Sequence, residues 1–93
     1  ITAERAYELG LVNKVVPVEL YLEEAVKLAR EVAQQSPLAI RLAKEAVLKA
    51  YDSPLSEGLE FERKNFYLLF ATDDQKEGMA AFVEKRAPYF KGK

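Results

Sequence analysis

The chain has 93 residues, which suffices for one small domain and leaves no room for two. Its 14 basic and 15 acidic residues give a net charge of −1, which argues against a general nucleic-acid binder because such proteins usually carry a basic excess. The absence of cysteine and histidine excludes disulfides, thiolate metal sites and the commonest general base.

The first third of the chain predicts two helices joined by an extended segment. Thr2 is a candidate N-cap for a short helix over residues 3–9, and Gly10 follows at the position that favours a left-handed stop. The stretch LVNKVVP, residues 11–17, is β-branched and ends in proline, which predicts a short strand or an extended connector. Apolar residues then recur at helical spacing over about residues 19–35.

Two serine–proline pairs, at residues 36–37 and 53–54, predict the starts of the next two helices. In each pair the serine would be the N-cap and the proline the first helical residue. The helix up to about residue 51 has an alanine-rich stripe, which lets a partner helix approach closely. These pairs are expected to be helix corners within a single helical domain over residues 1–93.

The helix after residue 54 is apolar on more than one side. Its main stripe is Leu55, Leu59, Phe66, Leu69 and Phe70, whereas Phe61, Tyr67 and Leu68 point elsewhere. Such a surface usually has two partners, so part of it is expected to be exposed in this chain alone. Gly58 costs this helix about 1 kcal/mol against alanine and indicates either a close helix contact or a tolerated glycine.

The last helix opens with TDDQ, residues 72–75, which has the form of a capping box. The Thr72 side chain would accept the N–H of Gln75, and Gln75 would reach back to Thr72. The helix is expected to run to about Lys85 or Arg86, whose charges suit the negative end of the helix dipole. The fold class predicted is therefore all-α, with about five helices and one short extended segment.

No catalytic constellation is visible in the chain. Its serines lack a histidine partner, and a glycine-rich phosphate loop is absent. Glutamates such as Glu60, four residues before Lys64, form solvated helix pairs, and without histidine or cysteine they are poor candidates for a metal site. We predict no catalytic and no metal-binding residue here. No apolar run approaches the roughly 20 residues of a membrane span, and no signal peptide is visible, so a reducing, cytoplasm-like setting is expected.

The end of the chain allows two interpretations. Cations gather there beside aromatic rings: Lys85, Arg86, Lys91 and Lys93 with Phe82, Tyr89 and Phe90. This combination suits a phosphate group that carries a flat base, through charge pairing and stacking. A solvated terminus whose cations complement the helix dipole accounts for the same residues.

Three stretches of the sequence resemble the C-terminal portion of the enoyl-CoA hydratase/isomerase, or crotonase, superfamily. They are ITAERAYELGLVNKVVP, SPLAIRLAKEAV and EGLEFERKNFYLLFATDDQKEGMAAFVEKRAPYF, and together they cover nearly the whole chain. The part FATDDQKEGMAAFVEKR is the most specific and is most similar to the hydratases themselves.

The resemblance implies a piece of a longer protein, as does the abrupt start at Ile1. Crotonases carry two catalytic glutamates and an oxyanion hole on an N-terminal core that precedes this region. The chain would be the helical part that packs on that core and builds a trimer, or a hexamer of two trimers. It is expected to be inactive alone, and a dimer made by helix exchange is possible for the isolated piece.

The resemblance also implies a ligand. The parent reaction would be hydration of a 2-enoyl-CoA to a 3-hydroxyacyl-CoA in fatty-acid β-oxidation, with the coenzyme A thioester as substrate and no cofactor. Phe82 and Lys85 match an aromatic residue and a lysine that contact coenzyme A in the family. The expected location is the cytoplasm, or the mitochondrial matrix in a eukaryote, with no nucleic-acid or membrane partner.

A second hypothesis is a free-standing helical protein-interaction domain without a catalytic role. It requires a self-sufficient core and a stable monomer. The unpaired LVNKVV segment counts against it, because a single strand cannot pair with itself.

Overall fold

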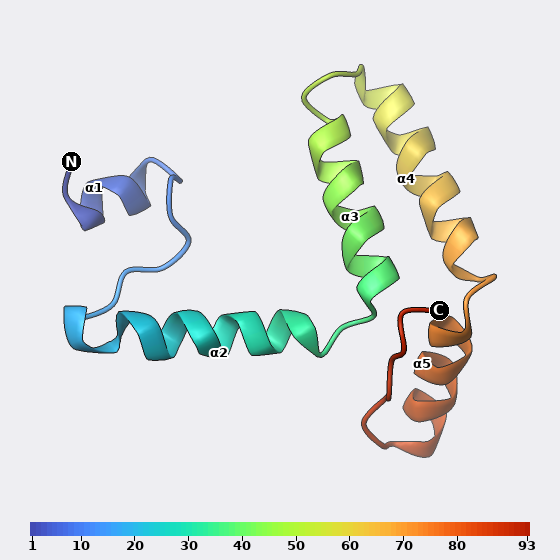
Figure 1. Cartoon of the computed structure of the whole chain (residues 1–93). Coiled ribbons are helices and arrows are strands. Elements are labelled where there is room, and N and C mark those ends of the chain that lie inside the picture. Colours follow the sequence, from blue (N-terminus) through green and yellow to red (C-terminus); the bar gives the residue numbers. More distant parts are fainter. The chain divides into compact units, whose positions relative to one another are not determined.

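The computed structural model describes all of residues 1–93 and contains five α-helices, one 3₁₀ turn and no β-strand (Figure 1). The predicted all-α class is confirmed. None of the helices is long and apolar enough to cross a membrane. The chain divides into two compact units, residues 1–31 and 32–93, which are described separately. The single domain predicted over residues 1–93 stays a prediction.

The first unit begins with helix α1, Ala3–Glu8. The Thr2 hydroxyl caps it as predicted, accepting the backbone N–H of Arg5 at 3.1 Å. Gly10 follows with a φ of 72°, a left-handed conformation that glycine adopts without steric cost. The helix therefore starts and stops where the sequence predicted, within one residue.

Residues 11–17 form an extended connector and not a strand. A 3₁₀ turn, Val18–Leu20, then leads into helix α2, Tyr21–Ala33. The Lys14 ammonium group hydrogen-bonds the Glu24 carboxylate, which ties the connector to α2. This bond and the charge of Lys14 lower the pKa of Glu24, against the opposing effect of burial.

The second unit contains an antiparallel pair of helices, α3, Pro37–Lys49, and α4, Leu55–Leu69 (Figure 1). The prediction for the first serine–proline pair is confirmed, since Ser36 is the N-cap of α3 and Pro37 its first residue, although the Ser36 hydroxyl makes no capping bond. The prediction for the second pair is wrong by one residue, because Pro54 and not Ser53 is the N-cap of α4. The Ser53 hydroxyl instead donates to the Lys49 carbonyl at 2.8 Å.

One polar link joins α3 to α4. Asn65 is buried, and its side-chain amide donates to the Leu42 carbonyl at 3.4 Å. A Cβ placed on Gly58 would meet only the Ser53 hydroxyl, at 3.7 Å, which is ordinary van der Waals contact. Within this chain Gly58 is therefore a tolerated glycine, the second of the two interpretations above.

Helix α5 spans Asp73–Glu84. Half of the predicted capping box is present, since the Thr72 hydroxyl accepts the Gln75 N–H at 3.1 Å. The reciprocal bond from Gln75 is not formed, because the Thr72 N–H donates to the Leu69 carbonyl at 3.0 Å instead. The helix ends at Glu84, slightly earlier than expected.

The apolar residues form almost no core of their own. Ala81 is the only apolar residue of the chain that is buried. Tyr67 and Leu68 are both more than 60% exposed, as the spread of apolar residues around α4 predicted. The chain thus presents apolar surface that a self-contained domain would cover.

Candidate functional site

The two residues predicted to bind a ligand lie at the end of α5. Phe82 is in the last helical turn, with 81% of its surface exposed. Lys85 follows directly after the helix, is exposed, and forms none of the chain's ion pairs. An open ring and an unpaired cation three residues apart are thus both free to contact a ligand.

The backbone reverses direction at Lys85. The Lys85 N–H donates to the Phe82 carbonyl at 3.3 Å, and the Arg86 N–H donates to the Ala81 carbonyl at 3.0 Å. These two bonds define a Schellman turn, in which the residue at the left-handed position is usually glycine. Here it is lysine, with a φ of 55°, and no other non-glycine residue of the chain has a positive φ.

Arg86 is held by two carboxylates of α5. Its Nη1 and Nη2 atoms lie 2.6 Å and 3.0 Å from the two oxygens of Glu77, a bidentate pair, and its Nε atom bonds Glu84. The hydrogen bonds from Arg86 and from the Tyr89 N–H outweigh burial and lower the pKa of Glu77 to about 2. The hydrogen bonds to Glu77 and Glu84 raise the pKa of Arg86.

The residues that follow, 86–93, are here called the strap. They return along α5 and are bound by their backbone. The Tyr89 N–H donates to Glu77 at 2.8 Å, and the Lys91 and Gly92 N–H groups donate to the two oxygens of Asp74 at 2.7 Å and 3.0 Å. The Asp74 N–H in turn donates to the Lys93 carbonyl at 2.9 Å.

Asp74 joins three segments of the second unit. It is 2% exposed, and besides the strap it accepts the hydroxyl of Ser36 at 2.7 Å. Burial acts to raise the pKa of Asp74, but donation from the Lys91 N–H, the Ser36 hydroxyl and the Gly92 N–H outweighs it and lowers that pKa. The TDDQ pattern places Asp74 in the first turn of the helix but does not predict this role.

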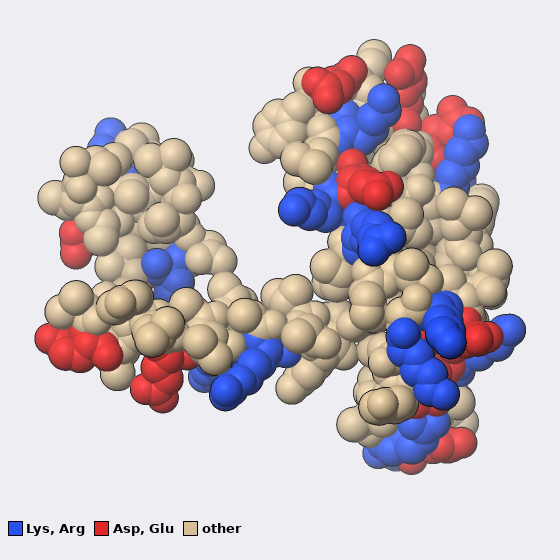
Figure 2. All heavy atoms as spheres, viewed as in Figure 1, with Lys and Arg blue, Asp and Glu red and all other residues tan.

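The predicted basic and aromatic cluster is divided by the fold. Phe90 packs on α5, and a Cβ on Gly78 would lie 3.4 Å from its ring. Arg86 is engaged by Glu77 and Glu84, so neither residue is open to a ligand. Figure 2 shows acidic and basic side chains side by side over α5, without a patch of one sign on that face. The side chains of Tyr89, Lys91 and Lys93 stay exposed, as do those of Phe82 and Lys85, the two residues predicted to bind a ligand.

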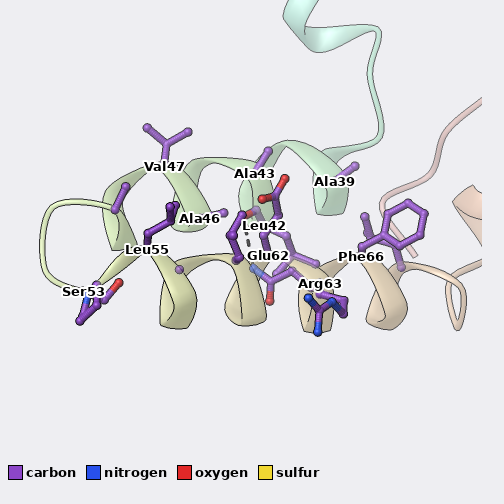
Figure 3. A pocket seen from close by; sticks show the side chains of 16 residues that line it. Ala39, Leu42, Ala43, Ala46, Val47, Ser53, Leu55, Glu62, Arg63 and Phe66 are labelled. Carbon is purple, nitrogen blue, oxygen red and sulfur yellow. Dashed lines mark hydrogen bonds between the residues drawn. The ribbon is translucent and has the colours of Figure 1, made fainter.

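A groove with a volume of about 920 Å³ lies between α3 and α4 (Figure 3). We call it the α3–α4 groove. Apolar residues of α3 and its C-cap line one side, and apolar residues of α4 line the other: Ala39, Leu42, Ala43, Ala46, Val47 and Ala50, and Leu55, Leu59, Phe66 and Leu69. Nothing in the chain fills it. No group of three or more acidic residues is placed to hold a metal ion.

The enoyl-CoA hydratase/isomerase family matches residues 1–93, and the chain belongs to that family. A probable mitochondrial enoyl-CoA hydratase from Dictyostelium discoideum is 53% identical over 93 residues, which cover all of this chain and 34% of that protein. The predicted resemblance is confirmed.

Solved structures agree with this assignment. An enoyl-CoA hydratase subunit from Geobacillus kaustophilus HTA426 is 63% identical with a TM-score of 0.91, and an enoyl-CoA hydratase from Bacillus anthracis is 43% identical with a TM-score of 0.95. Each match covers 100% of this chain and 36% of the solved one. The chain therefore spans about a third of the length of its relatives.

Proposed function

We propose that this chain is the C-terminal oligomerisation and acyl-CoA-flanking module of an enoyl-CoA hydratase. The reaction of the whole protein would be the hydration of a 2-enoyl-CoA to a 3-hydroxyacyl-CoA in fatty-acid β-oxidation. Family membership over residues 1–93 and relatives named as hydratases support the reaction class.

Assembly is the first part of this role. The observation that carries it is the open α3–α4 groove, together with a chain in which Ala81 is the only buried apolar residue. Apolar surface of this extent is typical of an interface. The missing N-terminal core and neighbouring subunits would cover it in a trimer or hexamer, and a second copy would cover it in a dimer of the isolated chain.

Contact with coenzyme A is the second part. Lys85 carries an unpaired ammonium group that suits a phosphate, and Phe82 carries an open ring on which a base can stack. Both act on the nucleotide end of the substrate and not on the reacting double bond. The thioester is a substrate, and the module needs no cofactor.

The chain alone is proposed to be inactive. The chain has no histidine and no cysteine, which removes the commonest general base and the commonest nucleophiles besides serine. The carboxylates with lowered pKa values, Asp74 and Glu77, are occupied by the strap. The catalytic glutamates would come from the core.

The alternative, a free-standing interaction domain, needs a core that this chain does not form. The cytoplasm, or the mitochondrial matrix, is the proposed location. The D. discoideum relative is named as mitochondrial.

The first experiment is the molar mass of the purified chain by light scattering, combined with an assay of crotonyl-CoA hydration. We expect an inactive dimer or trimer. A trimer would show that these helices carry the assembly information without the core, and a dimer would show substitute pairing of the exposed faces. A well-folded monomer would favour the interaction domain instead, and hydration of crotonyl-CoA by the pure chain would overturn the assigned inactivity.

A further inference from the structure

Lys85 is held in a backbone conformation that lysine rarely adopts. Its φ of 55° is left-handed, and a residue with a Cβ persists there only when its surroundings impose it. Such residues gather at binding and catalytic sites. The neighbours of Lys85 are therefore expected to hold it in this conformation.

Arg86, the residue after Lys85, is fixed by side-chain bonds. Arg86 is clamped by the bidentate pair with Glu77, and three residues later the Tyr89 N–H donates to the same carboxylate. One side chain on α5 thus fixes both the start and the middle of the strap. Because the Glu77 side chain is only 26% exposed and sits on a rigid helix, its position is well defined.

We propose that Glu77 is a positioning residue of the acyl-CoA site, holding Lys85 and Phe82 in their binding arrangement through Arg86 and Tyr89. This inference rests on the proposed contact of Phe82 and Lys85 with coenzyme A. Glu77 itself touches no ligand, since its two oxygens are occupied by the strap.

Removal of the Glu77 charge has a specific structural consequence. In Glu77→Gln the bidentate ion pair is lost, and the one remaining side-chain oxygen is a weaker, uncharged acceptor for Arg86 and the Tyr89 N–H. Arg86 would then form an ion pair only with Glu84, whose side chain is 58% exposed, while Asp74 would still bind the strap. The turn at Lys85 would then open more often. A ligand would have to order Lys85 on binding, and that entropic cost lowers affinity.

The decisive experiment is a double-mutant cycle in an active enzyme. This chain replaces the matched region of the G. kaustophilus hydratase subunit, to which it is 63% identical, and KM and kcat for crotonyl-CoA are measured. We expect Lys85→Ala to raise KM about three- to tenfold with kcat unchanged, as for a lost charged contact. Glu77→Gln should raise KM by a smaller factor, and should add nothing in the Lys85→Ala background.

Each outcome separates the two proposals. An unchanged KM for Lys85→Ala would remove the proposed coenzyme A contact itself. Two outcomes would overturn only the positioning role, both with a raised KM for Lys85→Ala. In the first, Glu77→Gln leaves KM unchanged; in the second, the double variant raises KM by the product of the two single factors. Glu84→Gln is the charge-matched control, because it also removes a carboxylate that binds Arg86. Glu84 accepts no backbone N–H of the strap, so KM should change less in this variant than in Glu77→Gln.

A second measurement uses the 93-residue chain and does not depend on the chimaera. The Arg86 N–H closes the turn on the Ala81 carbonyl, so its hydrogen-exchange rate reports how often the turn opens. Glu77→Gln should speed this exchange several-fold, whereas Glu84→Gln should change it less. Equal exchange in Glu77→Gln and the unsubstituted chain would overturn the inference.

Discussion

The α3–α4 groove and the strap on α5 show two opposite ways in which a helix surface is used. The groove is lined mainly by apolar side chains that nothing in the chain covers, and only the Asn65–Leu42 bond crosses its helix pair. The strap is polar, and the carboxylates of Asp74 and Glu77 accept hydrogen bonds from its backbone. Polar ties thus hold the end of the chain to α5, whereas the apolar surface of the groove stays uncovered in this chain.

The largest expected effect concerns assembly. Leu59 lines the groove and is 48% exposed, so Leu59→Asp should cost the isolated chain little. If a second copy covers the groove, the charge would be buried without a partner and the assembly would dissociate to monomers, which light scattering would detect. Leu48→Asp, on α3 but outside the groove, is the matched control and should leave the molar mass unchanged. An assembly that persists in Leu59→Asp would show that the groove is not the interface.

The next effect concerns the stability of the second unit. Asp74→Asn replaces an acceptor of three hydrogen bonds with an amide that presents its own N–H groups to donors. We expect the midpoint of thermal unfolding, followed by circular dichroism, to fall by several degrees while the molar mass stays the same. Asp73→Asn is the control, because Asp73 is exposed and pairs only with Lys76 at 3.7 Å. Equal unfolding midpoints for the two variants would show that the hydrogen bonds of Asp74 do not stabilise the second unit.

A smaller effect should follow pH. The pKa of Glu77 is lowered from 4.5 to about 2 by Arg86, the Tyr89 N–H and the charge of Lys91. A carboxyl group whose pKa is lowered on folding adds stability that is complete above its unfolded pKa, and that stability is lost as pH falls through the folded pKa. The strap should therefore loosen between about pH 4.5 and 2. The Arg86 amide exchange, corrected for its intrinsic pH dependence, should show this change. Glu77→Gln should show a smaller change, because Asp74, whose pKa is also lowered, still binds the strap.

The smallest effect belongs to Lys85. Glycine tolerates the left-handed conformation, so Lys85→Gly should raise the free energy of unfolding by about 0.5–1 kcal/mol, after allowance for glycine's greater entropy in the unfolded chain. Lys85→Ala should bring no such gain, since alanine keeps the Cβ. Urea unfolding of both variants tests the difference. A stability for Lys85→Gly no higher than for Lys85→Ala would show that the turn carries no strain.

The helices were predictable because their signals are local. Thr2, Gly10 and Thr72 mark helix ends by bonds that span at most four residues, and the structure confirms each of them. Ser36 is the N-cap as predicted, whereas Pro54 takes the N-cap position predicted for Ser53. Ser36 bonds Asp74, 38 residues away, and no local rule indicates a partner at that distance.

The candidate site was only partly predictable for the same reason. Phe82 and Lys85 were chosen by family resemblance, and their exposure was not predicted from the sequence. The engagement of Arg86 by Glu77 depends on the chain reversing at Lys85, which a lysine does not signal. A glycine at that position would have predicted the turn.

The bond between Ser36 and Asp74 also bears on the order of folding. The α3–α4 hairpin needs only contacts between neighbouring segments, so loop closure costs it little and it can form early. The Asp74 tie requires the start of α3, the start of α5 and residues 91–93 together. During synthesis it can close only after Lys93 has left the ribosome. Until then the N-terminal ends of α3 and α5 are not joined through Asp74, although the α3–α4 hairpin can already be formed.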